Sequence, residues 1–150
     1  MYCTLEDLKR LQPESILLQL ADDDEDGSFV IDPPNTAYRN VLEAIKDADS
    51  VIDSYLNGRY QTPIAEPVPD VIRQMSKNLA LVTLYERRRE LDVPEGMAER
   101  RKRHIQHLKD IQAEKASIPE LAGKKKSPAI VSVNKTDGDR VFSDSLLKQY

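Results

Sequence analysis

The sequence has little of what several classes of protein depend on. Its 150 residues contain one cysteine, Cys3, so no disulfide can form within the chain and the fold does not need an oxidising compartment. No apolar run approaches the roughly 18–20 residues of a membrane span. Residues 1–3 also do not open a signal peptide. We therefore expect a soluble protein that is made in the cytoplasm and has no membrane partner.

Sequence signatures of catalysis are also missing. The chain contains no HExxH, GxSxG, GxxxxGK[ST] or GxGxxG motif, which are the signatures of metalloproteases, hydrolases and nucleotide-binding proteins. Cys3 lies at a terminus that we expect to be frayed, where no fixed base would activate a thiol. We expect no enzymatic activity and no cofactor.

Aromatic residues make up only 5% of the chain and the isoelectric point is about 5.3, which argues against nucleic-acid binding. Three basic clusters, at residues 87–89, 100–104 and 124–126, could nevertheless contact phosphate if they share one surface. The simpler interpretation is a solvated helix face. A nucleic-acid-binding helical module that uses the arginine clusters is the alternative function.

Charge is unevenly distributed along the chain. Residues 1–60 carry 5 Lys/Arg against 13 Asp/Glu, a net charge of −8, whereas residues 73–115 carry 11 against 7, a net charge of +4. Opposite charge on the two halves favours head-to-tail contact between identical copies, which builds rings or filaments. Pairing of the two halves within one chain explains the same counts.

The most prominent stretch is residues 37–63, which predict one long amphipathic helix. Apolar residues recur there at steps of three and four, so they share one side of a helix. Gly58 supplies a residue that tolerates the left-handed conformation and closes the helix, and Pro63 prevents its resumption.

Other helices are predicted on both sides of this one. Thr4 begins a short helix over residues 4–12, with a cap close to a capping box, and Pro13 starts a second that carries Ile16, Leu17 and Leu20. A polar loop covers residues 21–36. A helix that begins near Asp70 has so wide an apolar belt that it must be enclosed on several sides, and residues 95–116 form a helix with a narrow apolar seam.

The C-terminal part of the sequence lacks the helical pattern of the preceding residues. Residues 129–133 have the β-branched character of a strand, and residues 140–142 could form a second strand after the Asp137-Gly138 turn. The predicted fold is mostly all-α, a bundle of four to five helices over residues 1–117. An extended C-terminal arm or short β-hairpin follows over residues 118–150.

The acidic loop contains a candidate metal site. Asp22, Asp24 and Asp26, followed by Gly27, match the opening of an EF-hand calcium loop. The twelfth position is Pro33, so the bidentate glutamate that closes such a loop is absent. A solvated acidic loop is the preferred interpretation, and a calcium-dependent module is the third candidate function.

His104 and His107 lie three residues apart on the last long helix, a spacing at which two imidazoles can share a metal ion. No carboxylate or cysteine cluster completes a site, and the flanking arginines would repel a cation. We interpret both as surface histidines and expect no metal.

The exit of the long helix is a candidate interface. Arginine and tyrosine are enriched among interface anchors, and the rigid corner after the helix would present them to a neighbour. The proposed contact residues here are Tyr55, Arg59, Tyr60 and Pro63. Tyr55 and Tyr60 could equally be residues at the rim of the core. We expect Arg59→Ala to leave the helical fold intact and to weaken assembly.

Four stretches of the sequence resemble one known family. Residues 1–8 have the form M-Y-x-T-x-E-D-L, and residues 47–63 have the form D-A-x-x-x-I-D-S-Y-L-x-G-R-Y-x-x-P. Residues 80–85 give A-L-x-x-L-Y and residues 140–143 give R-V-F-S. Together they resemble the small head completion proteins of Mu-like phages and prophages.

This resemblance implies a structural role as a mostly α-helical connector between the phage head and tail. The implied partners are other copies of the chain in a ring, the portal protein and a tail completion protein, with non-specific contact to passing DNA. The implied location is the virion, assembled in the cytoplasm of the bacterial host. Arg140 and Phe142, in the fourth stretch, join the predicted interface residues.

Overall fold

The computed structural model describes residues 1–88 and 90–124 of the chain. Within them it contains five α-helices and one 3-10 helix, and no strand. The elements are α1 (Leu5–Lys9), α2 (Glu14–Ala21), α3 (Thr36–Leu56), α4 (Asp70–Arg87), α5 (Glu95–Gln112) and η1 (Pro119–Lys124). The prediction of a mostly helical bundle is confirmed. The predicted strands over residues 129–133 and 140–142 lie outside the described residues.

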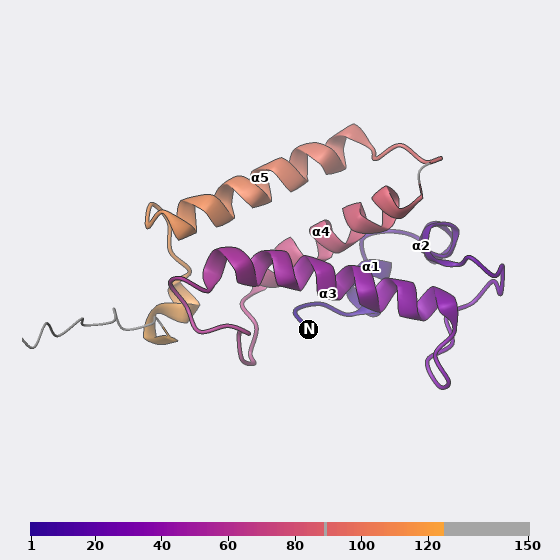
Figure 1. Cartoon of the computed structure of the whole chain (residues 1–150), viewed down its shortest axis with the longest axis horizontal. Helices are drawn as coiled ribbons and strands as arrows, with labels where there is room; N and C mark the ends of the chain where they lie inside the picture. Colours follow the sequence, from indigo (N-terminus) through magenta and orange to yellow (C-terminus); the bar gives the residue numbers. More distant parts are fainter. Residues whose placement is uncertain (89, 125–150) are drawn as a thin grey trace, which may run out of the picture.

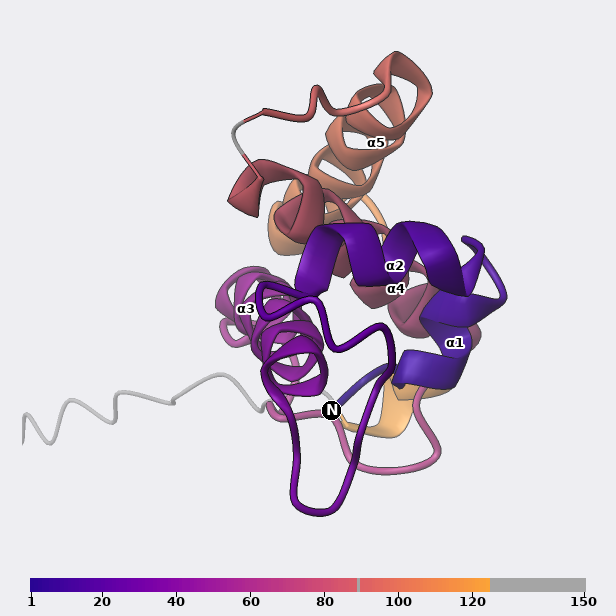
Figure 2. The same cartoon turned by 90° about the vertical axis from the view of Figure 1, so that its right-hand side faces the viewer.

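Helix α4 occupies the centre of the bundle. Helix α3 packs along one side of it, α5 lies across a second side, and α1 and α2 cover a third (Figures 1 and 2). Four consecutive residues of α4, Leu79–Val82, are buried, which only a helix with neighbours on several sides can achieve. The wide apolar belt read from the sequence is therefore enclosed as predicted.

Local signals set the starts of the helices. The Thr4 side chain accepts a hydrogen bond from the Asp7 N–H, and the Asp7 carboxylate accepts one from the Thr4 N–H, so α1 begins with the predicted capping box. Asn35, which the sequence analysis did not single out, caps α3 by accepting from the Tyr38 N–H at 3.1 Å.

The ends of two helices differ from the prediction. Gly58 does not have a positive φ. Helix α3 ends at Leu56 with Asn57 as its C-cap in right-handed conformation, and the Arg59 and Tyr60 N–H groups are bonded to the Leu56 carbonyl. The left-handed residue is Glu114, at φ 62°. It ends α5 at Gln112, four residues before the predicted position, with the Lys115 N–H returning to the Asp110 carbonyl.

Tyr2 and Cys3 are buried, whereas the sequence analysis expected a frayed terminus. The Tyr2 N–H donates to the Asp49 carboxylate of α3 at 2.8 Å, and the Ser76 hydroxyl of α4 donates to the same carboxylate at 2.6 Å. Cys3 lies beside Ser76, its Sγ 3.2 Å from the Ser76 Oγ. Burial raises the pKa of the Cys3 thiol to about 11, so the thiolate required of a nucleophile is disfavoured.

A second set of hydrogen bonds fixes the same segment. The Tyr2 hydroxyl accepts from the Ile64 N–H at 2.9 Å and donates to the Asp53 carboxylate. The pKa of the Tyr2 hydroxyl lies above its ordinary value. The main cause is burial, and the second is the hydrogen bond to Asp53. The start of the chain, α3 and the connector before α4 therefore meet at one side chain.

We predict that Tyr2→Phe lowers the free energy of unfolding by about 1–3 kcal/mol, because the buried Ile64 N–H loses its acceptor. Chemical denaturation followed by circular dichroism measures the change. Tyr38→Phe is the matched control, since no hydrogen bond is found for the Tyr38 hydroxyl among the described residues. Equal stabilities for the two variants would contradict the prediction.

Candidate functional site

The corner after α3 is tied to the end of α5 by Arg59. Its Nη1 donates to the Ile111 carbonyl at 2.7 Å and to the Ala116 carbonyl at 2.5 Å. A cation beside the last carbonyls of a helix is favourable because the helix dipole is negative there. Arg59 also lies over the ring of Tyr60, 5.7 Å from its centroid. Its guanidinium therefore has partners within the chain before any neighbour is considered.

The other proposed corner residues differ in exposure. Tyr60 is 0% exposed and its hydroxyl accepts from the Ile118 N–H at 3.1 Å, so in the single chain it is a core residue and offers no side-chain surface to a partner. Tyr55 is half-buried against the core, and Pro63 is exposed. Arg140 and Phe142 lie outside the described residues.

Ile118 and Leu121, which lie in the segment that the sequence analysis assigned to the arm, pack against the helices. Ile118 and Leu121 are each 1% exposed and belong to the same core cluster as α3 and α4. The predicted division of the chain into a helical domain over residues 1–117 and an arm over residues 118–150 remains a prediction.

The acidic loop before α3 is bound to the basic end of α4. The Asp23 carboxylate forms ion pairs with Arg87 and with Arg88, the latter at 3.1 Å, and Arg88 also donates to the Asp22 carbonyl at 2.8 Å. The pKa of Asp23 is lowered, first by the hydrogen bond from Arg87. For these residues, ion pairing within one chain accounts for the opposite charges of the two halves.

No metal site is found among residues 1–88 and 90–124, in that no three His, Cys, Asp or Glu side chains are grouped to hold an ion. Asp22 accepts the Gly27 N–H at 2.7 Å, Asp26 accepts the Asn35 amide at 3.2 Å, and Asp24 is exposed. The carboxylates that matched the EF-hand opening thus have different partners.

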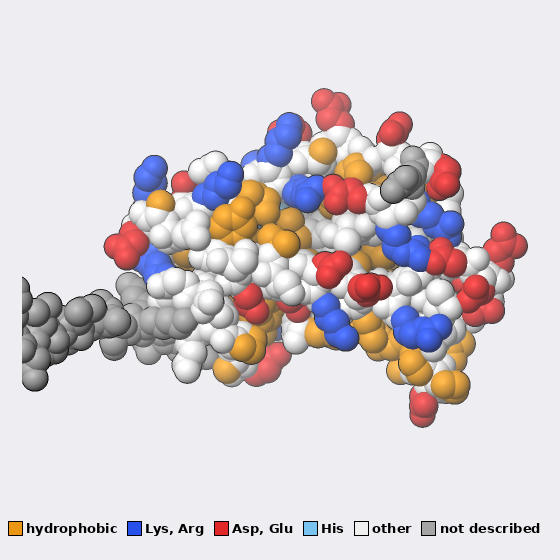
Figure 3. All heavy atoms as spheres, viewed as in Figure 1, with side chains coloured by type: hydrophobic (Ala, Val, Ile, Leu, Met, Phe, Trp, Pro, Cys, Tyr) orange, Lys and Arg blue, Asp and Glu red, His pale blue; other side chains and the backbone are white. Residues whose placement is uncertain are grey.

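The second half of this loop carries exposed apolar residues on an ordered backbone. We refer to Val30, Ile31, Pro33 and Pro34 as the apolar loop; Val30 is 41% exposed and Ile31 64%, and both prolines are exposed. The Asn35 side chain accepts from the Val30 N–H at 3.2 Å and donates to the Ser28 carbonyl at 2.8 Å. Figure 3 shows the loop as a protruding apolar knob.

An apolar groove opens between α4 and α5, visible as the apolar patch below the basic residues of α5 (Figure 3). Its volume is about 480 Å³, within the roughly 300–1,000 Å³ of pockets that hold ligands. The apolar lining residues are Val82, Val93, Ala98 and Ile105. We call this the α4–α5 groove.

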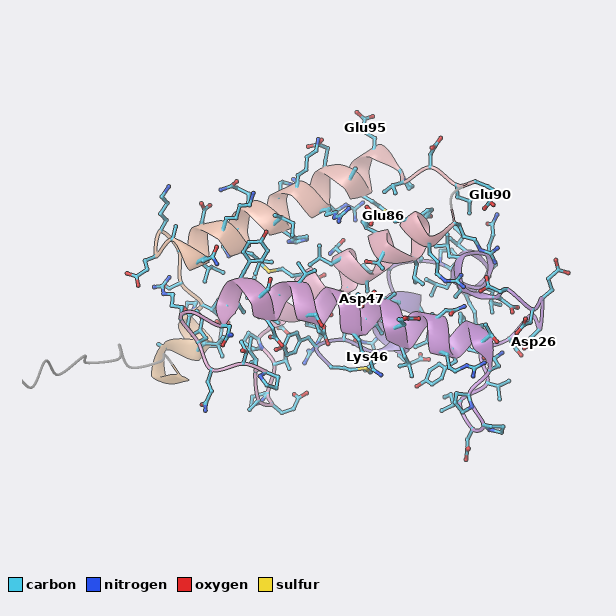
Figure 4. All side chains as sticks on the ribbon, in the orientation of Figure 1. Asp26, Lys46, Asp47, Glu86, Glu90 and Glu95 are labelled. Atoms are coloured by element: carbon cyan, nitrogen blue, oxygen red, sulfur yellow. The ribbon has the colours of Figure 1, made fainter. Side chains whose placement is uncertain are left out.

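The two sides of this groove differ in charge. Arg101, Lys102 and Lys109 border it from α5, and Arg101 forms an ion pair with Glu86 of α4. Figure 4 shows Glu86 between α5 and α3, with Asp47 on the α3 side. Glu86 of α4 and Asp47 of α3 line an adjacent hollow, so the basic side chains of α5 lie across from acidic side chains of α4 and α3.

A different face of α5 carries a second basic cluster. Arg100, Arg103, His104 and His107 follow the helical spacing of three and four and line one hollow with Val71 and Met75 of α4. We call this the basic hollow. The pKa of His104 is lowered, first by burial and then by the positive charge of Arg103, His107 and Arg100. Both histidines are half-buried here, whereas the sequence analysis placed them at the surface.

Sequence reasoning missed the contacts that join distant parts of the chain. Arg59 and Ile111 are 52 residues apart, and Tyr2 and Asp49 are 47 apart. No local pattern pairs such residues. The spacing of the basic residues within 100–109 already places them on two different faces of a helix. The sequence analysis could therefore have distinguished the two faces.

One comparison with known proteins finds a family. A family model described as Bacteriophage Mu, Gp36 matches residues 2–134. No match is found among curated proteins. The matched range contains the corner, the apolar loop, the α4–α5 groove and the basic hollow.

The structure changes the expectation for Arg59. We now predict that Arg59→Ala lowers the free energy of unfolding by about 1–3 kcal/mol, because two carbonyls near the end of α5 lose a charged donor. Denaturation of the purified variant measures this. Arg39→Ala is the control, since the exposed Arg39 bonds to Thr36 within the same helical turn and its loss falls within about 0.5 kcal/mol. If Arg59→Ala is as stable as the wild type, the prediction is wrong and Arg59 can act only at an interface.

Proposed function

From the premise that this chain belongs to the Bacteriophage Mu Gp36 family, we propose that it is a head completion or head–tail connector protein. In this role it is a non-enzymatic structural component of the virion. Copies of the chain form a ring at the portal vertex, with the portal protein on one side and a tail completion protein on the other. Assembly takes place in the cytoplasm of the bacterial host.

The family match carries this proposal, because it extends over residues 2–134 of 150. It thus includes every helix of the described residues. Among the described residues, no helix is long and apolar enough to cross a membrane.

Two features of the described residues support assembly with other chains. The apolar loop is exposed although it is ordered by Asn35, and the α4–α5 groove is open although its lining is mostly apolar. Ordered apolar surface that faces solvent marks interaction sites. Both surfaces lie on the helical body.

We predict that the purified chain forms rings, or binds purified portal protein, or both. Size-exclusion chromatography with light scattering over a range of concentrations measures self-association, and negative-stain images distinguish rings from filaments. Pull-down with portal particles tests the second partner. A protein that stays monomeric at high concentration and does not bind portal would contradict the connector proposal, whereas monomers that bind portal would fit assembly on a template.

The basic hollow favours a second candidate function, contact with DNA. Its two arginines are exposed, so one helix face presents two positive charges beside the two histidines. Phosphate neutralisation by such side chains is independent of sequence and weakens with salt. This contact would serve either a nucleic-acid-binding module or a connector through which DNA passes.

We predict that duplex DNA binds weakly at low salt and that the double variant Arg100→Glu, Arg103→Glu reduces the slope of log affinity against log salt by about 2, because two phosphate contacts are lost. Fluorescence anisotropy at several salt concentrations measures the slope. Arg10→Glu with Arg39→Glu is the control, because it changes charge equally at two exposed arginines outside the hollow. The same loss in both double variants would indicate a general effect of net charge.

A further inference from the structure

The apolar loop and the α4–α5 groove are complementary in character. Ile31 is 64% exposed at the tip of an ordered loop, with Val30 at 41% beside it, so among the described residues these aliphatic side chains are left largely open to water. The groove has a volume of about 480 Å³ and a partly apolar lining, which leaves room for aliphatic side chains. One surface projects and the other is recessed.

The loop cannot enter the groove of its own chain. It extends from the side of the body opposite α5 in two views related by a 90° rotation (Figures 1 and 2). The hydrogen bonds of Asn35 to Val30 and Ser28 hold it in that position. An occupant of the groove must therefore come from elsewhere.

Charge distinguishes between the possible occupants. Asp32 is exposed within the apolar loop, and Lys102 and Lys109 border the groove, so a loop that entered the groove would bring opposite charges together. Residues 125–150 of the chain carry 5 Lys/Arg and 3 Asp/Glu, a net charge of +2. This segment has the same sign as the border of the groove and is the weaker candidate.

We propose that the apolar loop of one copy inserts into the α4–α5 groove of a second copy, with Asp32 facing the lysines of α5. The two surfaces are different patches of the same molecule, so the contact is heterologous and leaves a free loop and a free groove for further copies. Repetition closes a ring or extends a filament. The inference rests on the proposed connector function and supplies the contact between its subunits.

Cross-linking between two differently labelled copies tests this contact. Ile31→Cys and Lys102→Cys are made in separate full-length proteins, which are mixed and treated with a short bis-maleimide. Both sites are exposed. The native Cys3 is 2% exposed and its pKa is raised to about 11, so it reacts slowly. We expect a cross-linked dimer that contains one copy of each variant.

Val51→Cys mixed with Lys102→Cys is the matched control, because Val51 is an exposed aliphatic residue on α3, 39% exposed and outside the loop. We expect little product from it, and little from either variant alone. Equal yields from the Ile31 and Val51 mixtures, or no yield from the Ile31 mixture, would overturn the proposed contact.

A second measurement does not depend on the linker. We expect Ile31→Glu to weaken self-association at least about tenfold, because it removes a buried aliphatic side chain from the contact and places a charge there. Val51→Glu is the control, and light scattering measures both. If Ile31→Glu associates like wild type while rings still form on portal, the loop contact is wrong and the connector function stands. If the wild type neither self-associates nor binds portal, both the loop contact and the connector function are wrong.

Discussion

The structure depends on the enclosure of α4. The middle of α4, with four consecutive buried residues, cannot be left in water on any side, so α3, α5 and the α1–α2 pair are all required around it. Helix α3 has a wide apolar side and covers the side of α4 against which it packs. Helix α5 has a narrow seam, with Met97, Leu108 and Ile111 as its buried residues, and it covers α4 only partly. The α4–α5 groove, with Val82 of α4 in its lining, is the consequence of this mismatch.

Features of the fold set by neighbours along the chain were predictable from the sequence. The periodicity of residues 37–56 and 70–87 places the long helices, and the pairing of Thr4 with Asp7 places the first cap. Features set by partners far along the chain were not. Glycine is the usual left-handed residue at a helix end, so the sequence argument placed that conformation at Gly58. Helix α3 ends without it, and α5 ends with it at Glu114.

The candidate site shows the same limit. Tyr60 and Arg59 were read as a displayed corner because their residue types suit interfaces, yet Tyr60 binds the Ile118 N–H and Arg59 binds carbonyls beyond α5. Composition identifies side chains that can anchor a contact and does not say which element they anchor. The apolar loop gave the opposite case. Residues 29–31 interrupt a polar segment, and the exposure of Val30 and Ile31 could be recognised only after Asn35 was seen to hold the loop away from the core.

The charge distribution takes on a different meaning once α5 is in place. Part of the acidic excess is neutralised within the chain by Arg87 and Arg88, and a concentration of basic side chains lies on α5. Successive residues of that helix point to different faces, so Arg100 and Arg103 line the basic hollow while Arg101 and Lys102 border the groove. A block replacement of residues 100–104 would remove both surfaces together. Contact with DNA and contact between copies can be separated only by substitutions chosen three and four residues apart.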